Sequence, residues 1–271
     1  NDFDPSGGIL VLQSVKTPPD SGVTVTVVDH SLLQISAAST VPANLTVEYT
    51  VTNGTSSATG KVAIVPVTQS QPQPPVVTND TAVVRAGDVV TASVLDNDSS
   101  PAGLNLSVDS QVSLVGDELG TAWVSENTVR FRAGNQPGRT SYAYTAKDDQ
   151  GQTASGVLTV EVRAQDAEHN SAPSPRNLEA RTLAGSTTNI TVPLDGIDPD
   201  GDSVSLVGLN QAPSLGSVEI NSSWLTYTPS EGATGTDTFT YVVEDRFGAQ
   251  ATGTVRVGVA QASPLNVAPV A

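Results

Sequence analysis

The chain has 271 residues, and its 28 acidic and 12 basic side chains give a formal net charge of −16. A surface of that sign repels phosphate groups, which argues against nucleic acids and anionic membranes as partners. Aromatic residues make up only 4% of the chain, and runs rich in Val and Thr are separated by Gly and Pro. Because no segment keeps an apolar repeat at helical spacing, the composition predicts an all-β fold.

Cysteine is absent from the chain, so disulfides and thiolate metal sites are excluded. Extracellular sandwich domains of eukaryotes often carry disulfides, and their absence here favours a bacterial protein that is secreted or displayed on the cell surface. The sequence has no apolar run of membrane-spanning length, and we therefore expect no membrane insertion.

Three segments of the chain resemble one another, at residues 45–54, 140–149 and 238–245. Tyr49, Tyr144 and Tyr241 correspond, at separations of 95 and 97 residues. One repeat therefore has about 96 residues, the size of an immunoglobulin-like sandwich. The alternation of apolar and polar residues around each tyrosine predicts a strand that packs one face onto a core, with the tyrosine in that core.

Linkers rich in Pro and small polar residues, at 69–75 and 165–175, divide the chain. We expect an incomplete immunoglobulin-like repeat that lacks its first strands at 1–68, complete repeats at 69–166 and 172–262, and the start of a further repeat or a linker at 263–271. Because such linkers are stiff, the predicted fold is a row of tandem immunoglobulin-like (cadherin-like) β-sandwich domains in an elongated array.

The strands predicted in the two complete repeats form matching series, except that 81–85 has no predicted counterpart in the later repeat. In the earlier repeat they lie at 81–85, 88–94, 104–108, 121–125, 128–132, 140–147 and 153–162. In the later repeat they lie at 186–194, 203–208, 215–220, 224–228, 237–244 and 250–259.

The first residues of the chain align with a position well inside the following repeat, not with its start. Asn1-Asp2 corresponds to Asn97-Asp98, so the first unit has no counterpart of residues 76–96, which include two predicted strands. A sandwich without two strands exposes backbone edges and apolar side chains. Two outcomes remain open: residues 1–67 pair with another chain through strand addition, or they form a self-sufficient remnant.

Residues suited to catalysis are few. The histidines are His30 and His169, and neither belongs to a recognisable catalytic constellation. The sequence has no phosphate-binding glycine loop and no zinc-ligand spacing. Trp123 and Trp224 fall at different places in their repeats, and we expect each to lie in a local core. These features predict a protein that is not an enzyme.

One turn concentrates carboxylates. The segment Asp198-Pro-Asp-Gly-Asp202 places three carboxylates at alternate positions around a Gly, a spacing that suits a hard cation with six to eight oxygen ligands. Asp, Pro and Gly are also ordinary turn formers, so both interpretations remain open.

Several motifs resemble one known family. They are Val94-Leu-Asp-Asn-Asp98, the run from Leu194 to Val204, Gly235-Thr-Asp-Thr-Phe-Thr-Tyr241 and Glu244-Asp245. In these segments the chain resembles the cadherin-like, bacterial immunoglobulin-like tandem repeats of large bacterial surface or secreted proteins. The resemblance implies calcium near a domain junction, with Asp195, Asp198, Asp200, Asp202, Glu244 and Asp245 as candidate ligands. A weaker set follows in the preceding repeat, where two expected carboxylates are missing: Asp96, Asp98, Asp148 and Asp149.

The function expected from these features is that of a structural or adhesive extension module, with neighbouring repeats as its partners and calcium as its one cofactor. The alternative is an accessory module of a surface enzyme that binds carbohydrate or protein. A carbohydrate site requires exposed aromatic side chains, whereas the aromatic residues here fall mostly on the inward register. Selective binding on a glycan array would favour the alternative.

Overall fold

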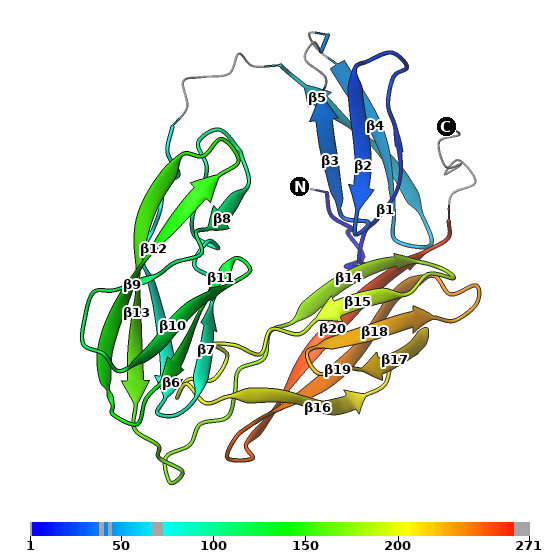
Figure 1. Ribbon diagram of the computed structural model, residues 1–271. Coiled ribbons are helices and arrows are strands. Elements are labelled where there is room, and N and C mark those ends of the chain that lie inside the picture. Colours follow the sequence, from blue (N-terminus) through cyan, green and yellow to red (C-terminus); the bar gives the residue numbers. More distant parts are fainter. Residues whose placement is uncertain (1, 38–40, 43–44, 67–72, 263–271) are drawn as a thin grey trace.

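The computed structural model describes residues 2–37, 41–42, 45–66 and 73–262, and every regular element among them is a strand (Figure 1). The predicted all-β fold is therefore confirmed. The expected start of a further repeat at 263–271 and most of the linker at 69–75 lie outside the described residues. No helix in the described part of the chain is long and apolar enough to cross a membrane.

Residues 73–163, called repeat two, form a sandwich of two sheets with strand orders β6-β13-β12-β8 and β10-β11-β7, and β9 pairs with β12. Strand β6 runs parallel to β13, whereas the other pairs are antiparallel. The strands are β6 (Asp80–Arg85), β7 (Val89–Ala92), β8 (Leu106–Val108), β9 (Ser113–Leu114), β10 (Gly120–Ser125), β11 (Thr128–Ala133), β12 (Gly138–Asp148) and β13 (Thr153–Arg163).

Residues 174–262, called repeat three, have the same plan, with sheets β14-β20-β19-β16 and β15-β18-β17. Strand β14 runs parallel to β20, as β6 does to β13. The strands are β14 (Leu178–Leu183), β15 (Thr188–Thr191), β16 (Val204–Gln211), β17 (Gly216–Ile220), β18 (Trp224–Pro229), β19 (Gly235–Asp245) and β20 (Gln250–Ala260).

Residues 2–66, called the N-terminal unit, form the sheet β1-β4-β5 and the hairpin β2-β3. These correspond to β8-β12-β13 and β10-β11 of repeat two. No strand among the described residues fills the positions that β6 and β7 occupy there. The strands are β1 (Val11–Lys16), β2 (Val23–Val28), β3 (Leu32–Ala37), β4 (Leu45–Thr52) and β5 (Ser57–Ile64).

The repeated tyrosine explains why these strands pack alike. Tyr144 and Tyr241 are fully buried, and each ring lies over a glycine of the next strand. A Cβ added at Gly253 would lie 2.4 Å from Cζ of Tyr241, so the ring fits only because that position has no side chain. Tyr49 of the N-terminal unit is half-buried, and its hydroxyl donates a 2.6 Å hydrogen bond to Oδ2 of Asp2.

The units differ in how they meet (Figure 1). Repeats two and three join end to end through residues 164–173, called the connecting segment. The N-terminal unit does not extend this row, because its β1 lies against β20 of repeat three. The backbone N–H of Ile9 donates a 2.8 Å hydrogen bond to Oγ1 of Thr236, and Nε of Arg181 donates one of 2.7 Å to the carbonyl of Leu10. Among the described residues, no sheet is shared by the two units.

Candidate metal centre

The acidic turn after Ile197 is shaped by its own first carboxylate. Oδ1 of Asp198 accepts backbone hydrogen bonds from Asp200 at 2.9 Å and from Asp202 at 3.1 Å, which fixes the loop as a tight turn. Gly201 has a φ of +82°, and a Cβ there would lie 2.7 Å from Cα of Val84. Only glycine lets the turn approach β6 of repeat two so closely, and the turn is thereby seated at the junction of the two repeats.

The structure brings together part of the predicted ligand set. Asp198, Asp200 and Asp202 each offer a carboxylate oxygen within 4.8 Å of the others. Asp245 lies beside this triad without joining it, and its charge acts on both Asp198 and Asp202. Two predicted residues lie apart: Asp195 is exposed, and Glu244 accepts a hydrogen bond from the side chain of Gln250 on the neighbouring strand.

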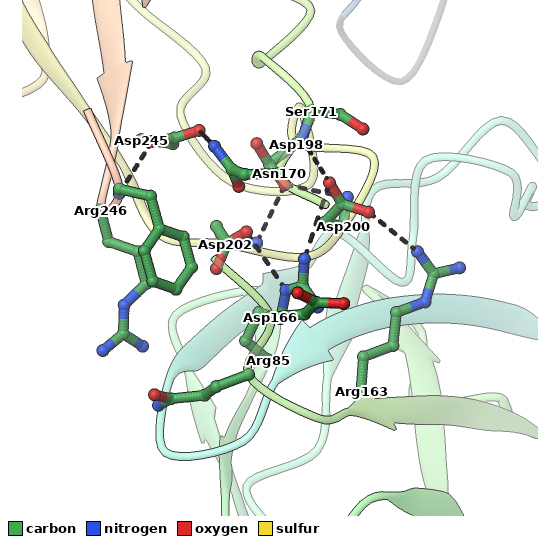
Figure 2. A network of polar contacts seen from close by, with 12 residues as sticks. Arg85, Arg163, Asp166, Asn170, Ser171, Asp198, Asp200, Asp202, Asp245 and Arg246 are labelled. Atoms are coloured by element: carbon green, nitrogen blue, oxygen red, sulfur yellow. Dashed lines mark hydrogen bonds and ion pairs between the residues drawn. The ribbon is translucent and has the colours of Figure 1, made fainter. Parts of the chain in front are cut away.

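Repeat two contributes two arginines to this turn (Figure 2). Nε of Arg85 lies 3.2 Å from Oδ2 of Asp202, and its Nη2 lies 3.6 Å from Oδ2 of Asp200. Nη1 of Arg163 lies 3.8 Å from Oδ1 of Asp200 and donates a 2.7 Å hydrogen bond to the carbonyl of Pro199. The Arg85 and Asp202 side chains are 5% and 0% exposed, so this ion pair is a buried contact across the junction.

The connecting segment closes the third side of the site (Figure 2). The backbone N–H of Ser171 donates a 2.8 Å hydrogen bond to Oδ2 of Asp200. Nδ2 of Asn170 donates one of 2.7 Å to Oδ2 of Asp245, whose other oxygen caps the turn after β19 through Phe247 and Ala249. Arg85 and Asn170 are not among the predicted site residues, because neither carries a local sequence signal that links it to the acidic turn.

Burial and local contacts move the carboxylates in opposite directions. Burial raises the pKa of Asp198, and the neighbouring charges of Asp245 and Asp200 raise it further. The pKa of Asp202 is also raised, chiefly by burial, although Arg85 opposes the shift. The pKa of Asp200 is lowered by the backbone N–H of Ser171 and by the two arginines. The site therefore holds two carboxylates whose charge is costly without a further positive group.

Three oxygens of the site are buried without a hydrogen-bond donor among the described residues: Oδ2 of Asp198, Oδ1 of Asp202 and Oδ1 of Asn170. Unsatisfied buried oxygens are rare in folded proteins, and each carries the cost of its lost hydration. Among the described residues, the guanidinium groups of Arg85 and Arg163 pair with Asp200 and Asp202, and no ion pair reaches Asp198 or Asp245. An excess of negative charge with oxygen donors to spare fits a hard divalent cation.

The weaker predicted set does not form such a site in the described part of the chain. Oδ1 of Asp148 accepts 2.9 Å hydrogen bonds from the backbone of Gln150 and Gln152, the same capping role that Asp245 has after β19. Asp98 accepts a 2.9 Å hydrogen bond from the backbone of Thr78. Asp149 accepts one of 3.0 Å from Asn105. Asp96 belongs to no group of potential metal ligands among the described residues.

The family model for the bacterial Ig domain matches residues 72–161 and 170–258, which are repeats two and three. The chain belongs to the bacterial Ig domain family. The resemblance seen in the motifs is thereby confirmed for both bacterial Ig repeats. No curated protein matches the chain.

The chain is also similar to several solved structures. The endo-fucoidan hydrolase MfFcnA4 from glycoside hydrolase family 107 is 16% identical, with a TM-score of 0.33 over 92% of this chain and 39% of that one. Sidekick-1 immunoglobulin domains 1–4 are 14% identical, with a TM-score of 0.39 over 93% of this chain and 66% of theirs. The Protocadherin GammaB4 extracellular domain is 15% identical, with a TM-score of 0.28 over 92% of this chain and 45% of its own. The bacterial Ig chain thus spans about two fifths of the length of the fucoidan hydrolase.

Proposed function

We propose that this chain is a non-enzymatic extension and adhesion module of a large bacterial protein that is secreted or displayed on the cell surface. The observation that carries the proposal is the junction of repeats two and three, where a buried ion pair and a three-sided polar site fix one repeat against the next. Interfaces between neighbouring domains are usually small and permit relative motion. A fixed junction transmits orientation along the chain, as a spacer requires.

We also propose that calcium binds this junction. The carboxylates of Asp198, Asp200 and Asp202 and the free amide oxygen of Asn170 would hold the ion, with Asp245 adding negative charge close by. Calcium supplies positive charge that neutralises the buried carboxylates. Because the site draws on repeat three and on the connecting segment, with repeat two beside it, a bound ion would stiffen the junction. Asp195, Glu244 and the weaker set around Asp148 stay outside this proposal.

Thermal unfolding of the whole chain tests the calcium site. Trp224 lies in repeat three and Trp123 in repeat two, so Trp224 fluorescence in a Trp123→Phe background reports on repeat three. At a calcium concentration about 100 times Kd, the stabilisation of about 2.7 kcal/mol should raise the melting temperature by roughly 10–20 °C. Asp200→Asn should abolish that rise. Asp195→Asn on the same segment is the matched control and should keep it. An equal melting temperature with calcium and with chelator would contradict the site.

The N-terminal unit offers a further place for a partner. Its outer strand β5 has no neighbour among the described residues at the position that β6 fills beside β13. We include strand addition at this edge, by residues of another chain, in the proposed adhesive role. Sedimentation at increasing protein concentration tests it: Ala63→Pro, which removes a donor that faces the open edge of β5, should weaken any self-association that uses this edge.

A second candidate function is supported by exposed aromatic side chains. Trp224 is 41% exposed, which corrects the expectation that it lies in a core, and Phe3 is 80% exposed. Exposed aromatic rings are what an accessory module of a surface enzyme would use to bind carbohydrate or protein. Selective glycan-array binding that is lost in Trp224→Ala would establish this role in place of a purely structural one.

A further inference from the structure

The last strand of repeat three is more deeply buried than its counterpart in repeat two. In β13, buried and less buried residues alternate to the end of the strand, as expected when one face meets the core. In β20 the alternation stops, and the residues from Val257 to Ala260 are all buried. The outward face of repeat three is therefore covered at this end, and the covering element is the N-terminal unit.

The contact has an apolar centre. Ile9 is 4% exposed and Val11 is fully buried, and both side chains lie over Gly258 of β20. A Cβ added at Gly258 would lie 2.7 Å from Cγ2 of Ile9 and 2.9 Å from Cγ2 of Val11. Gly258 thus forms a notch on the outer face of the sheet that admits these two branched side chains.

Polar groups surround this centre. Arg181 of β14 donates to the carbonyl of Leu10, and Arg256 of β20 donates to the carbonyl of Gly7. Oγ1 of Thr236 accepts from the N–H of Ile9. Backbone groups of the segment that leads into β1 are thereby satisfied by repeat three, which fixes the register of the contact.

Repeat two carries different residues at the same ladder positions. In repeat three, Gly258 pairs with Arg181 across β20 and β14. In repeat two, the equivalent pair across β13 and β6 is Glu161 with Val83. Thr159 of repeat two stands where Arg256 stands in repeat three. Repeat two therefore lacks both the notch and the two arginines, although its sandwich has the same plan.

We propose that the outer face of the β14–β20 pair is a docking site selective for the N-terminal unit, and that release of this unit switches the chain from a folded-back form to an extended form. The proposal rests on the proposed function as an extension module. It adds that the chain becomes longer when the N-terminal unit is released. Release is local because it breaks side-chain contacts around β1 and leaves every sheet of the described chain intact. The partner that the site fits is a strand with two branched apolar side chains and free backbone carbonyls.

Repeat two supplies the replacement residues for a test of the docking site on repeat three. The triple variant Arg181→Val, Arg256→Thr, Gly258→Glu gives repeat three the residues that repeat two carries, so the sandwich has a precedent for folding with them. The mirror variant Val83→Arg, Thr159→Arg, Glu161→Gly changes repeat two in the opposite sense and is the matched control. Because the chain has no cysteine, dyes can be placed by Thr46→Cys and Glu231→Cys, both on exposed positions.

Energy transfer between the dyes is measured in single molecules of the full chain, with saturating calcium in every sample. We expect a high-transfer population in the parent and in the mirror variant, and its loss in the triple variant together with a larger radius of gyration in small-angle scattering. Ile9→Asp, on the docking partner itself, should give the same loss. High transfer retained in both the triple variant and Ile9→Asp would overturn the proposal. Since calcium is constant throughout, this outcome is independent of whether the metal site exists.

Discussion

Tyr144 in repeat two and Tyr241 in repeat three occupy the same place in the two sandwiches, each fully buried beneath the neighbouring strand. The first strand of each repeat, by contrast, ends in a different residue. Strand β6 ends in Arg85, which crosses the junction to Asp202, whereas β14 ends in Leu183 at the matching position. Two domains with one core plan therefore present different chemistry at their ends and on their outer faces.

Buried residues and outward-facing residues have different roles in the two repeats. The buried alternation of each repeat sets the sandwich and tolerates little change, because interiors are close-packed. A few outward residues, such as Arg85 and Gly258, decide which unit can lie next to which. Repeats of one family can then be joined in a fixed order without altering their cores.

The largest effect is expected in the shared core. Tyr241→Ala should destabilise repeat three by about 3–5 kcal/mol, because it empties a fully buried ring site beside Gly253. Tyr241→Phe should cost only about 1 kcal/mol, since it removes just the hydrogen bond to the carbonyl of Arg176. Urea unfolding followed by Trp224 fluorescence measures both. Equal costs for the two variants would mean that the hydroxyl, and not the ring, stabilises the repeat.

The next effect distinguishes the ends of the two repeats. Arg85→Leu installs the residue found at the matching place in repeat three and leaves the Asp202 carboxylate buried without its partner. The loss should be about 3 kcal/mol in the unfolding of repeat three, because an unpaired buried charge is costly. The double variant Arg85→Leu, Asp202→Leu should recover most of it. Additive losses in the double variant would show that the ion pair is not coupled across the junction.

The response to pH should depend on the metal. Because the pKa of Asp198 and that of Asp202 are raised on folding, their contribution to stability is greatest below the unfolded value of 3.8 and is lost as pH rises through the folded pKa. With chelator at pH 7, Asp198→Asn should therefore raise the melting temperature, since its amide oxygen can still accept the backbone hydrogen bonds of the turn. With calcium the same variant should lower it, since a ligand is removed. A change of the same sign in both buffers contradicts a metal role for this residue.

The smallest effect is expected at the surface of the N-terminal unit. Nζ of Lys61 lies 3.4 Å from Oε1 of Glu48, but both side chains are largely exposed. Solvent screens such a pair, and Lys61→Ala should change the stability by less than about 1 kcal/mol. Hydrogen exchange of the β4 and β5 amides measures it. A loss several times larger would place this pair among the contacts that hold the unit together.

The sequence predicted what depends on local patterns. The long hairpin strands expected at 140–147 and 237–244 correspond to β12 and β19, because apolar alternation and the repeated tyrosine mark them. The acidic turn was predicted because its three carboxylates are adjacent in sequence. Arg85 joins that turn from a strand more than a hundred residues away, and Asn170 has no distinguishing neighbours, so neither could be assigned. Nothing in the sequence distinguishes Gly258 from other strand glycines, because its notch is defined by Ile9 and Val11 of the N-terminal unit.

We propose that a cation stiffens the junction of repeats two and three. Spin labels introduced by Thr121→Cys and Glu219→Cys, on exposed positions of the two repeats, allow their separation to be measured by pulsed electron paramagnetic resonance. A narrow distance distribution in calcium, a broad one in chelator, and a broad one in both buffers for Asp200→Asn are the predicted results. Distributions of equal width with and without calcium in the parent chain would contradict the claim.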